Sequence, residues 1–370
     1  MILTEDEHRG TWLGRVWRPG FGPSVITVRD GTVFDITSKA APTTRDLLER
    51  EDRVSFAQGA TGEALGPLDA LEGLLAPCDL QAVKAAGVTF ARSMIERVIE
   101  ERAAGDPAQA EAIRQRVKAP IGDNLADLVP GSEASEAVKE MLIAEGLWSQ
   151  YLEVGIGPHA EVFTKTPPLA SVGHGAEVGL HPASSWNNPE PEVVLAVTSK
   201  GEIVGATLGN DVNLRDIEGR SALLLPKAKD NNASSAIGPM IRLFDESFSL
   251  EDVLSATLSM SVEGEDGYRL EGSSAMAEIS RDPRDIVAQT IGDHHQYPDG
   301  LMLFLGTAFA PIEDRDEPGE GFTHKIGDLV TISCPGLGTL QNRVNLSTNC
   351  PPWTFGMADL MRNLAERGLI

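Results

Sequence analysis

The alternation of apolar and polar residues is clearest near the N-terminus. The stretch SVITVRDGTVFDIT, residues 24–37, alternates over two short runs on either side of Asp30 and Gly31. A period of two is typical of half-buried strands, and an Asp-Gly pair between such runs favours a tight hairpin turn. We therefore predict a hairpin here, inside a small β-rich unit that extends to about residue 76.

A helical pattern follows between residues 77 and 147. The stretch LQAVKAAGVTFARSMIERVIEERA is dense in strong helix formers. Another helix is predicted to begin with Asp106 as N-cap and Pro107 at the first helical position, and a further one at Asp282 and Pro283 in the same way. From about residue 151 onward, short β-patterned runs separated by Gly, Pro and Asn predict a β-dominated region.

Charge and cysteine content narrow the functional classes. The 370 residues carry a net charge of −24, which disfavours nucleic acid and anionic membranes as partners because both are polyanions. No stretch reaches the roughly 18 apolar residues that a membrane span needs, and the acidic start MILTEDEHRG lacks the pattern of a signal peptide. Three cysteines without CxxC spacing argue against a disulfide framework and a zinc cluster. We expect a cytoplasmic protein with a small-molecule ligand.

Two acidic residues precede an apolar, β-branched run in NNPEPEVVLAV, residues 187–197. Side chains alternate between the two faces of a strand, so Glu190 and Glu192 are predicted to share one face. Pro191 cannot donate a hydrogen bond to a neighbouring strand, which places this end of the strand at an edge or rim.

The next turn signal brings a third carboxylate to this pair. A fold-back at the Lys-Gly pair of residues 200–201 pairs positions whose numbers sum to 401, so Glu190 falls opposite Asp211. Three carboxylates at one place repel one another unless a cation holds them, and oxygen ligands favour Mg²⁺ first, then Mn²⁺ or Ca²⁺, over zinc. The alternative is that Glu190 and Glu192 lie at a solvated edge and Asp211 caps a turn.

Five motifs in a fixed order resemble the fumarylacetoacetate hydrolase superfamily. They are PEPEVVLAV, GNDVNLRD at 209–216, KDNNASSAIGP at 229–239, FLGTAFAP at 304–311 and KIGDLVTISCPGLGTLQN at 325–342. The resemblance covers about residues 77–345. It implies an α+β, β-dominated fold with a small β-rich N-terminal domain, residues 1–76, and a β-roll catalytic domain, residues 77–370, in which residues 77–150 form a helical lid or connecting segment. It also implies a homodimer or homotetramer.

The resemblance assigns roles to individual residues. Glu190, Glu192 and Asp211 match the family's ligands for Mg²⁺ or another divalent ion, and Lys229 matches its active-site lysine. Thr307 matches a threonine that contacts a substrate carboxylate.

Other candidate residues carry open alternatives. Lys165 lies where the family often has an FxK segment, and either a substrate contact or packing at the edge of the core fits. Arg215 is a candidate substrate-binding residue, or forms a structural ion pair with Asp216. His294 and His295 suggest a metal site, but adjacent residues on a regular element face apart, which favours a loop or surface role.

One departure from the family changes the expected reaction. Its hydrolases carry a stretch like NYxxHxxE, whose His and Glu activate water; TFARSMIE, residues 89–96, has Ser93 in place of the His and keeps Glu96. Without the imidazole, the group best suited to deprotonating water near pH 7 is missing. The blocks AAGVTFARSMIERVIEERA, SSWNNPEPE and GRSALLLPKAKDNNASSAIGP look most like the superfamily's 2-keto-3-deoxy-D-pentonate (arabinonate) dehydratases.

We therefore predict a Mg²⁺-dependent lyase that removes water from a 2-keto-3-deoxy sugar acid to give 2-oxoglutarate semialdehyde. Glu96 is the predicted acid/base, and Lys229 stabilises an enolate or carries a second proton. The predicted substrate-binding residues are Ser93, Arg215, Thr307 and Lys165. Two other functions fit the same residues: a hydrolase that cleaves a C–C bond of a diketo acid, and a non-catalytic, metal-stabilised binding protein.

Overall fold

The computed structural model describes residues 1–4, 7–104, 106, 109–110, 128–144, 146, 148–316 and 321–370, with the backbone alone at residues 91–93 and 95. Its strands are β1 Trp12–Arg18, β2 Gly22–Arg29, β3 Thr32–Asp35, β4 Glu63–Pro67, β5 Leu74–Leu75, β6 Ala82–Ala86, β7 Val162–Thr166, β8 Glu177–Leu180, β9 Pro191–Val197, β10 Ile203–Asp211, β11 Ser235–Leu243, β12 Thr257–Glu263, β13 Arg269–Ala275, β14 Leu301–Phe304, β15 Leu329–Cys334 and β16 Gly338–Leu346. Its helices are α1 Thr44–Leu48, α2 Arg53–Gly59, α3 Ala91–Arg102, α5 Glu133–Ala144, α6 Gln150–Ile156, α7 Arg215–Glu218, α8 Leu225–Lys229, α9 Leu250–Ser255, α10 Pro283–Thr290 and α11 Met357–Glu366.

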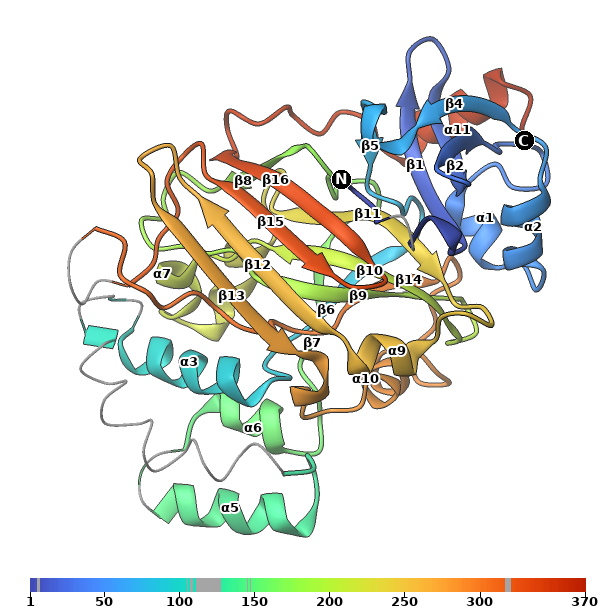
Figure 1. Cartoon of the computed structure of the whole chain (residues 1–370). Coiled ribbons are helices and arrows are strands. Elements are labelled where there is room, and N and C mark those ends of the chain that lie inside the picture. The colour runs from blue at the N-terminus through green and yellow to red at the C-terminus, as the bar shows by residue number, and fades with distance from the viewer. Residues whose placement is uncertain are drawn as a thin grey trace.

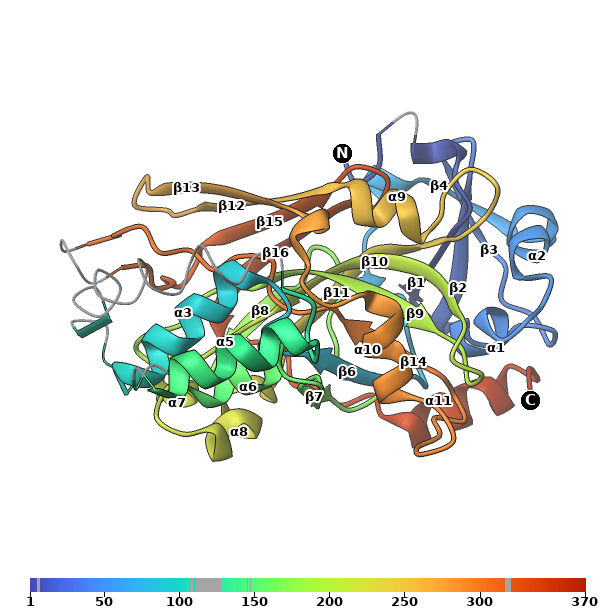
Figure 2. The same cartoon turned by 90° about the horizontal axis from the view of Figure 1, so that it is seen from below.

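Two sheets form the layers of the fold (Figures 1 and 2). In the described part of the chain, the larger sheet has 11 strands in the order β4-β3-β2-β1-β11-β10-β9-β14-β6-β7, with β5 paired to β1. The smaller sheet has five strands in the order β13-β12-β15-β16-β8. Most neighbours are antiparallel, whereas β14 with β6 and β16 with β8 are parallel. The predicted α+β, β-dominated class is confirmed.

The N-terminal hairpin forms as the sequence predicts. Arg29 pairs with Thr32, and the two turn residues Asp30 and Gly31 both have positive φ, 49° and 75°. That conformation matches the twist of the flanking strands, and glycine adopts it without strain. Strand β1 then pairs with β11, so the N-terminal strands continue the larger sheet. The predicted domain boundary at residue 76 stays a prediction.

The helical prediction for residues 77–147 is wrong for its first part. The segment AVKAA forms strand β6, which pairs with β14 on one side and β7 on the other. Sheet pairing on both sides outweighs the helix-favouring composition of these residues, because propensity is only a weak determinant of structure. The chain becomes helical at α3, and α10 begins at Pro283 with Asp282 as its N-cap, as predicted. The helix predicted to begin at Asp106–Pro107 lies largely outside the described residues; residues 109–110, which are described, are helical.

Strand β9 is buried on both faces, which explains its continuous apolar run. On one face, Val193 and Leu195 join a core shared with the smaller sheet, including Met260 of β12 and Ile332 of β15. On the other face, Val194 belongs to a core that includes residues of α1 and β14. Glu192 shares the face of Val194 because side chains two residues apart point the same way.

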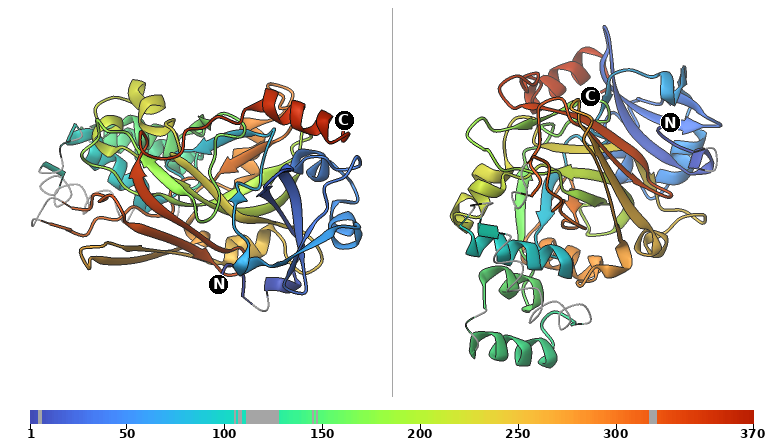
Figure 3. Two further views of the ribbon diagram at one scale, coloured as in Figure 1. Left: turned by 90° about the horizontal axis from the view of Figure 1, so that it is seen from above. Right: turned by 60° about the vertical axis from the view of Figure 1, so that its left-hand side comes forward.

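Helices cover the two ends of the sheets (Figure 3). Helices α3 and α6 pack together through Met94, Val98, Leu152 and Ile156 near the acidic end of β9. At the opposite end, α11 packs beside the N-terminal strands, where the Asn363 side chain donates to the Phe21 backbone oxygen at 2.8 Å. No helix within the described residues is both long and apolar enough to cross a membrane.

Two sequence expectations outside the acidic cluster are also met. His294 and His295 are exposed in a loop, where His294 contacts the backbone oxygen of Gln289 at 3.2 Å. The three cysteines are free and buried, so they form no disulfide.

Candidate active site and metal centre

Strands β9 and β10 bring the predicted carboxylates together. Gly209 is paired with Glu192, and the N–H of Asp211 donates to the backbone oxygen of Glu190 at 3.0 Å. This is the predicted register. The connecting loop, residues 198–202, is longer than the predicted two-residue turn, and a register shift early in β10 restores the alignment. The acidic ends of the two strands therefore meet as the sequence indicates.

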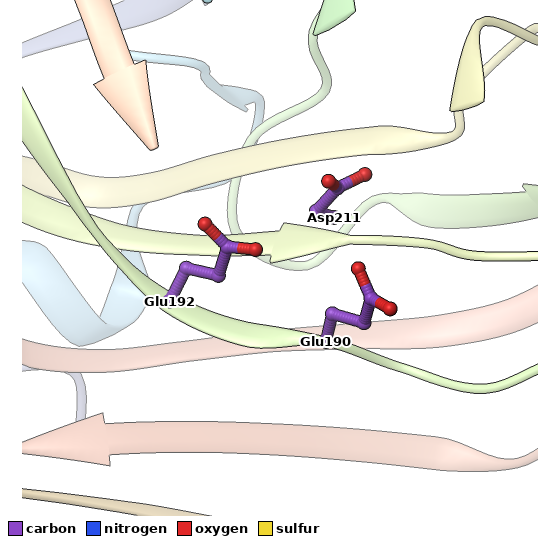
Figure 4. A group of neighbouring side chains, drawn as sticks. All are labelled: Glu190, Glu192 and Asp211. Carbon is purple, nitrogen blue, oxygen red and sulfur yellow. The ribbon is translucent and has the colours of Figure 1, made fainter. Parts of the chain in front are cut away.

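Glu190, Glu192 and Asp211 form one buried carboxylate cluster (Figure 4). One oxygen from each side chain lies within 4.8 Å of the others. All three residues are at most 2% exposed, so the alternative of a solvated edge is wrong. An all-oxygen donor set of this kind suits a hard divalent ion, Mg²⁺ first.

Three cationic side chains hold two of these carboxylates. The Nζ of Lys229 lies 2.5 Å from Oε2 of Glu190 and 3.2 Å from Oδ2 of Asp211. The Nζ of Lys165 lies 2.6 Å from Oδ1 of Asp211, and the guanidinium of Arg97 contacts the other oxygen of Glu190. Burial alone would raise the pKa of Glu190, but Arg97 and Lys229 lower it to about 2. Glu190 is therefore ionised at neutral pH.

Glu192 has no cationic partner among the described residues. It accepts a hydrogen bond from the N–H of Gly306 at 2.7 Å and one from the Thr307 hydroxyl at 3.3 Å. Burial, and then the charges of Asp211 and Glu190, raise the pKa of Glu192 well above its ordinary value. An unpaired buried carboxylate is costly. The cluster thus fits a divalent ion, which would supply the missing positive charge.

The two lysines differ in their electrostatics. Burial lowers the pKa of Lys229, but Asp211 and Glu190 outweigh burial and raise it above its ordinary value, so Lys229 stays charged. Burial lowers the pKa of Lys165, whose ammonium also donates to the backbone oxygens of Lys229 and, at 3.4 Å, Val212. The structure therefore directs Lys165 toward protein groups, and its predicted substrate contact stays a prediction.

A buried ion network connects α3 to α7 behind the carboxylate cluster. Nη1 of Arg97 lies 2.6 Å from Oε2 of Glu100 and 3.1 Å from Oε2 of Glu218. Nε of Arg215 lies 3.2 Å from Oε1 of Glu100. Asp216 instead accepts a hydrogen bond from the Ser184 hydroxyl at 2.7 Å. The suggested ion pair between Arg215 and Asp216 is therefore wrong, and Arg215 serves the network with α3.

A small cavity lies at the cluster. Its free volume is about 20 Å³, which holds about one water molecule or ion. A ligand much larger than a water molecule therefore fits only if part of the cavity wall moves. Its lining residues are Ala86, Gly87, Val88, Arg97, Tyr151, Glu161, Phe163, Glu190, Glu192, Asp211, Glu218, Lys229 and Thr307.

Two predicted residues on α3 are not placed in this cavity. Glu96 is half-buried on α3, where it interacts electrostatically with Arg215, and it is not a lining residue. The side chain of Ser93 lies outside the described residues. Their assigned roles, like that of Arg215 as a substrate ligand, stay predictions.

Sequence reasoning missed Arg97, Glu161 and Glu218, all of which line the cavity. Helical spacing could have indicated two of them. Arg97 lies four residues after Ser93, and Glu218 three after Arg215, so each shares a helix face with a residue that was considered. Glu161 carries no such signal.

Comparisons with known proteins agree with this geometry. A family model described as "Fumarylacetoacetate (FAA) hydrolase C-terminal" matches residues 155–345. A probable 2-keto-3-deoxyxylonate dehydratase of Haloferax volcanii is 33% identical over 194 residues, which cover 52% of this chain and 63% of that protein. A 2-dehydro-3-deoxy-D-arabinonate dehydratase of Saccharolobus solfataricus is 32% identical over 180 residues, which cover 49% of this chain and 57% of that protein. The matches thus span less than two thirds of either relative.

Solved structures share the fold. The apo form of a 2-keto-3-deoxy-D-arabinonate dehydratase superposes with a TM-score of 0.63 at 22% identity, covering 90% of this chain and 99% of that chain. The same coverage holds for a 2-keto-3-deoxy-D-arabinonate dehydratase complexed with magnesium and 2,5-dioxopentanoate, with a TM-score of 0.61 at 21% identity. The fumarylacetoacetate hydrolase of Exiguobacterium antarcticum gives 0.57 at 16% identity, covering 91% and 99%. With a family match over more than half of its residues and the same fold, the chain belongs to the fumarylacetoacetate hydrolase family.

Proposed function

We propose that this protein is a Mg²⁺-dependent hydro-lyase that removes water from a 2-keto-3-deoxy sugar acid. The expected reaction converts 2-keto-3-deoxy-D-pentonate to 2-oxoglutarate semialdehyde, which is 2,5-dioxopentanoate. The observation that carries the proposal is the buried cluster of Glu190, Glu192 and Asp211 beside Lys229. The names of the two curated relatives, and the 2,5-dioxopentanoate named in the complex of the structural neighbour, support this substrate class.

A metal ion and the cationic side chains of the site would act on the substrate in different ways. A divalent ion on these three carboxylates would act as a Lewis acid toward the keto oxygen of the substrate and make its C3 proton more acidic. Because the protein has a net charge of −24, an anionic substrate also needs positive charge close to its binding site. Lys229 and Arg97 place fixed positive charge in the cavity, and the raised pKa of Lys229 keeps it charged.

This charge state favours one of the two roles predicted for Lys229. A lysine that stays protonated stabilises negative charge developing on the substrate oxygen, as preorganised cations do in other enzymes. It is a poor base, because it has no free lone pair at neutral pH. We therefore assign Lys229 to electrostatic stabilisation of the enolate.

Proton removal from C3 is assigned to Glu96. Its carboxylate lies on α3, the helix that also brings Arg97 to Glu190. Because the cavity holds little more than one water molecule, admission of the substrate requires a shift of its wall, and α3 and α6 form part of that wall through Arg97 and Tyr151. Such a shift is the step that would bring Glu96 to the substrate. Thr307 and Arg215 are assigned to binding of the substrate's polar groups.

Hydrolysis of a C–C bond in a diketo acid is the second candidate. The fold shared with the fumarylacetoacetate hydrolase of Exiguobacterium antarcticum favours it. Ser93 disfavours it, because a serine replaces the histidine that would activate water. The two reactions use the same cluster and differ in their products.

Product analysis separates these functions. Purified protein with Mg²⁺ is incubated with 2-keto-3-deoxy-D-pentonate, and separately with an acylpyruvate. Formation of 2-oxoglutarate semialdehyde from the first substrate supports dehydration, and release of pyruvate from the second supports hydrolysis. Turnover of neither, together with tight keto-acid binding that Glu96→Gln and Lys229→Ala leave unchanged, would identify a binding protein instead.

We also propose a cellular compartment and an oligomeric state for the enzyme. Three buried free thiols fit the reducing cytoplasm. A homodimer or homotetramer fits the exposed apolar side chains Trp353, Met357 and Met361, which are 46%, 52% and 62% exposed at or near α11. Light scattering during size-exclusion chromatography would give the mass, and a 39.5 kDa monomer would contradict the proposed assembly.

A further inference from the structure

A second cavity lies between the N-terminal segment and the smaller sheet, remote from the carboxylate cluster. Its volume of about 610 Å³ is within the usual range for small-molecule sites. Its wall includes Ile2 of the N-terminal segment, Ser333 of β15 and Arg242 of β11. On β11, Ser235 pairs with Asp211, and Arg242 lies seven residues further along. The two sites are therefore about 20 Å apart along this strand.

Two aromatic rings and a glycine hold the guanidinium of Arg242, a residue that is only 7% exposed. Its Cζ lies 5.2 Å from the centre of the Trp12 ring and 4.6 Å from that of Phe248, within the range of cation–π contacts. A Cβ built on Gly10 would lie 2.3 Å from both Cζ and Nε of Arg242. The missing side chain at position 10 therefore provides the space that the guanidinium occupies.

The N–H groups of Arg242 are poorly satisfied by the protein. A guanidinium carries five N–H donors. Nη1 lies 3.4 Å from the backbone oxygen of Gly336 and Nη2 lies 3.5 Å from the Ser247 hydroxyl, both longer than an ordinary hydrogen bond of this kind. Nε is buried and has no hydrogen-bond partner among the described residues. Such groups are rare in folded proteins, and each requires an explanation.

The carboxylates near Arg242 do not neutralise it directly. Asp245 and Glu7 act on Arg242 electrostatically, but neither forms an ion pair with it. Asp245 accepts a hydrogen bond from the Thr11 hydroxyl at 2.7 Å, and Glu7 accepts one from the N–H of Gly336 at 2.9 Å. Burial lowers the pKa of Arg242, and the nearby carboxylates offset this effect only in part. Arginine keeps its charge in proteins, so the cavity wall carries an incompletely compensated cation.

We propose that this cavity is a second binding site, which takes the carboxylate of a small organic acid. The planar fork of a guanidinium matches a carboxylate, which supplies the partner that the donors of Arg242 lack. Ile2, Phe248 and Pro335 offer apolar surface to the rest of the ligand. Glu7 in the same wall and the net charge of −24 disfavour a doubly charged phosphate. The ligand class is therefore a monocarboxylate with an apolar body.

Direct binding measurements test this site. EDTA-treated full-length protein is titrated by isothermal calorimetry with hexanoate and phenylacetate, and separately with the neutral phenylacetamide and with inorganic phosphate. EDTA prevents binding through a metal ion at the carboxylate cluster. The titrations are repeated on Arg242→Met. The matched control is Arg284→Met, the same substitution at an arginine whose side chain is 50% exposed and does not line this cavity.

The expected result depends on the charge of the ligand and on Arg242. At least one of the two carboxylates binds the wild type at one site per chain, and phenylacetamide binds much more weakly than phenylacetate. Arg242→Met lowers the affinity by about 10- to 100-fold, as expected when hydrogen bonds to a charged group are lost. Arg284→Met keeps the wild-type affinity. Failure of both carboxylates to bind, equal affinity in Arg242→Met, or tighter binding of the amide or of phosphate would overturn the proposal.

A second variant keeps the arginine and changes its position. In Gly10→Ala, the three atoms nearest to the added Cβ all belong to the guanidinium of Arg242, so this group must move and carboxylate affinity should fall. In the Arg242→Met background, the alanine should add little, because both changes act on one group. If Arg242→Met does not fold, as circular dichroism would show, Gly10→Ala decides: unchanged affinity in this variant refutes the site.

The outcome does not depend on the proposed dehydration. A protein that binds carboxylates through Arg242 but dehydrates no sugar acid keeps the second site and loses the proposed function. An active dehydratase that binds none of these carboxylates refutes the second site alone.

Discussion

Replacing Arg97 tests the electrostatic architecture of the site. The guanidinium contacts Glu190 and also Glu100 and Glu218, at 2.6 and 3.1 Å, and the residue is 7% exposed. Arg97→Met keeps much of the side-chain volume but leaves these buried carboxylates without their shared partner. Removing one member of a buried ion pair costs about 3–5 kcal/mol. We expect a decrease of this size in the free energy of unfolding of the metal-free protein at pH 7.

Added Mg²⁺ should reverse part of this loss. An ion that binds only the folded state stabilises it by about 2.7 kcal/mol at 100 times its Kd. The variant should gain more than the wild type at equal Mg²⁺, because the ion no longer competes with Arg97 for Glu190. Urea unfolding followed by tryptophan fluorescence, with EDTA and with Mg²⁺, measures both quantities.

A surface ion pair provides the control. Arg284 contacts Glu251, but the two side chains are 50% and 69% exposed, and such pairs contribute about 0–1 kcal/mol. Arg284→Met should therefore change stability little. If Arg97→Met costs no more than this control, or if Mg²⁺ stabilises variant and wild type equally, the reasoning about the ion network is refuted.

Three further substitutions test other parts of the structure. Glu192→Gln should weaken Mg²⁺ binding by at least about 100-fold, which is more than the usual loss when a residue that only hydrogen-bonds to a metal ligand is replaced. The EDTA-treated variant should unfold no more easily than the wild type, because the substitution removes a costly buried charge. An unchanged Mg²⁺ affinity in a calorimetric titration would refute this prediction. The pKa of Asp328 is lowered to about 2, because Arg315, 2.5 Å away, outweighs the opposing effect of burial. The stabilisation that Asp328 contributes is complete above about pH 4 and is lost as the pH falls toward about 2, so Asp328→Asn should cost about 2–3 kcal/mol at pH 7 and much less near pH 2. A loss of stability that does not depend on pH would contradict the ion pair. Gly209→Ala would place a Cβ 2.3 Å from the ring of Phe304, so it should destabilise the protein by about 1–3 kcal/mol in thermal unfolding, and a neutral result would contradict this packing.

Local sequence signals determined the parts of the fold that were predicted correctly. Asp30 and Gly31 form the expected turn, and the acidic end of the β9–β10 pair has the expected register. Strand alternation and a short connection between neighbouring strands leave few choices of pairing. This is why Glu190 and Asp211 could be placed together without a structure.

Long-range pairing explains what the sequence did not reveal. Residues 82–86 have helix-favouring composition, but β14, about 220 residues further along the chain, pairs with them as a strand. Arg97 lies 93 residues from Glu190, and no local pattern links them. The raised pKa of Glu161 likewise depends on its burial and on where α7, α3 and α8 place the charges around it.

The most direct test of the account is a Mg²⁺ titration of EDTA-treated protein during turnover of 2-keto-3-deoxy-D-pentonate. The account predicts that the chelated protein forms no 2-oxoglutarate semialdehyde and that activity returns with one Mg²⁺ bound per chain. Full activity of the metal-free protein would contradict it.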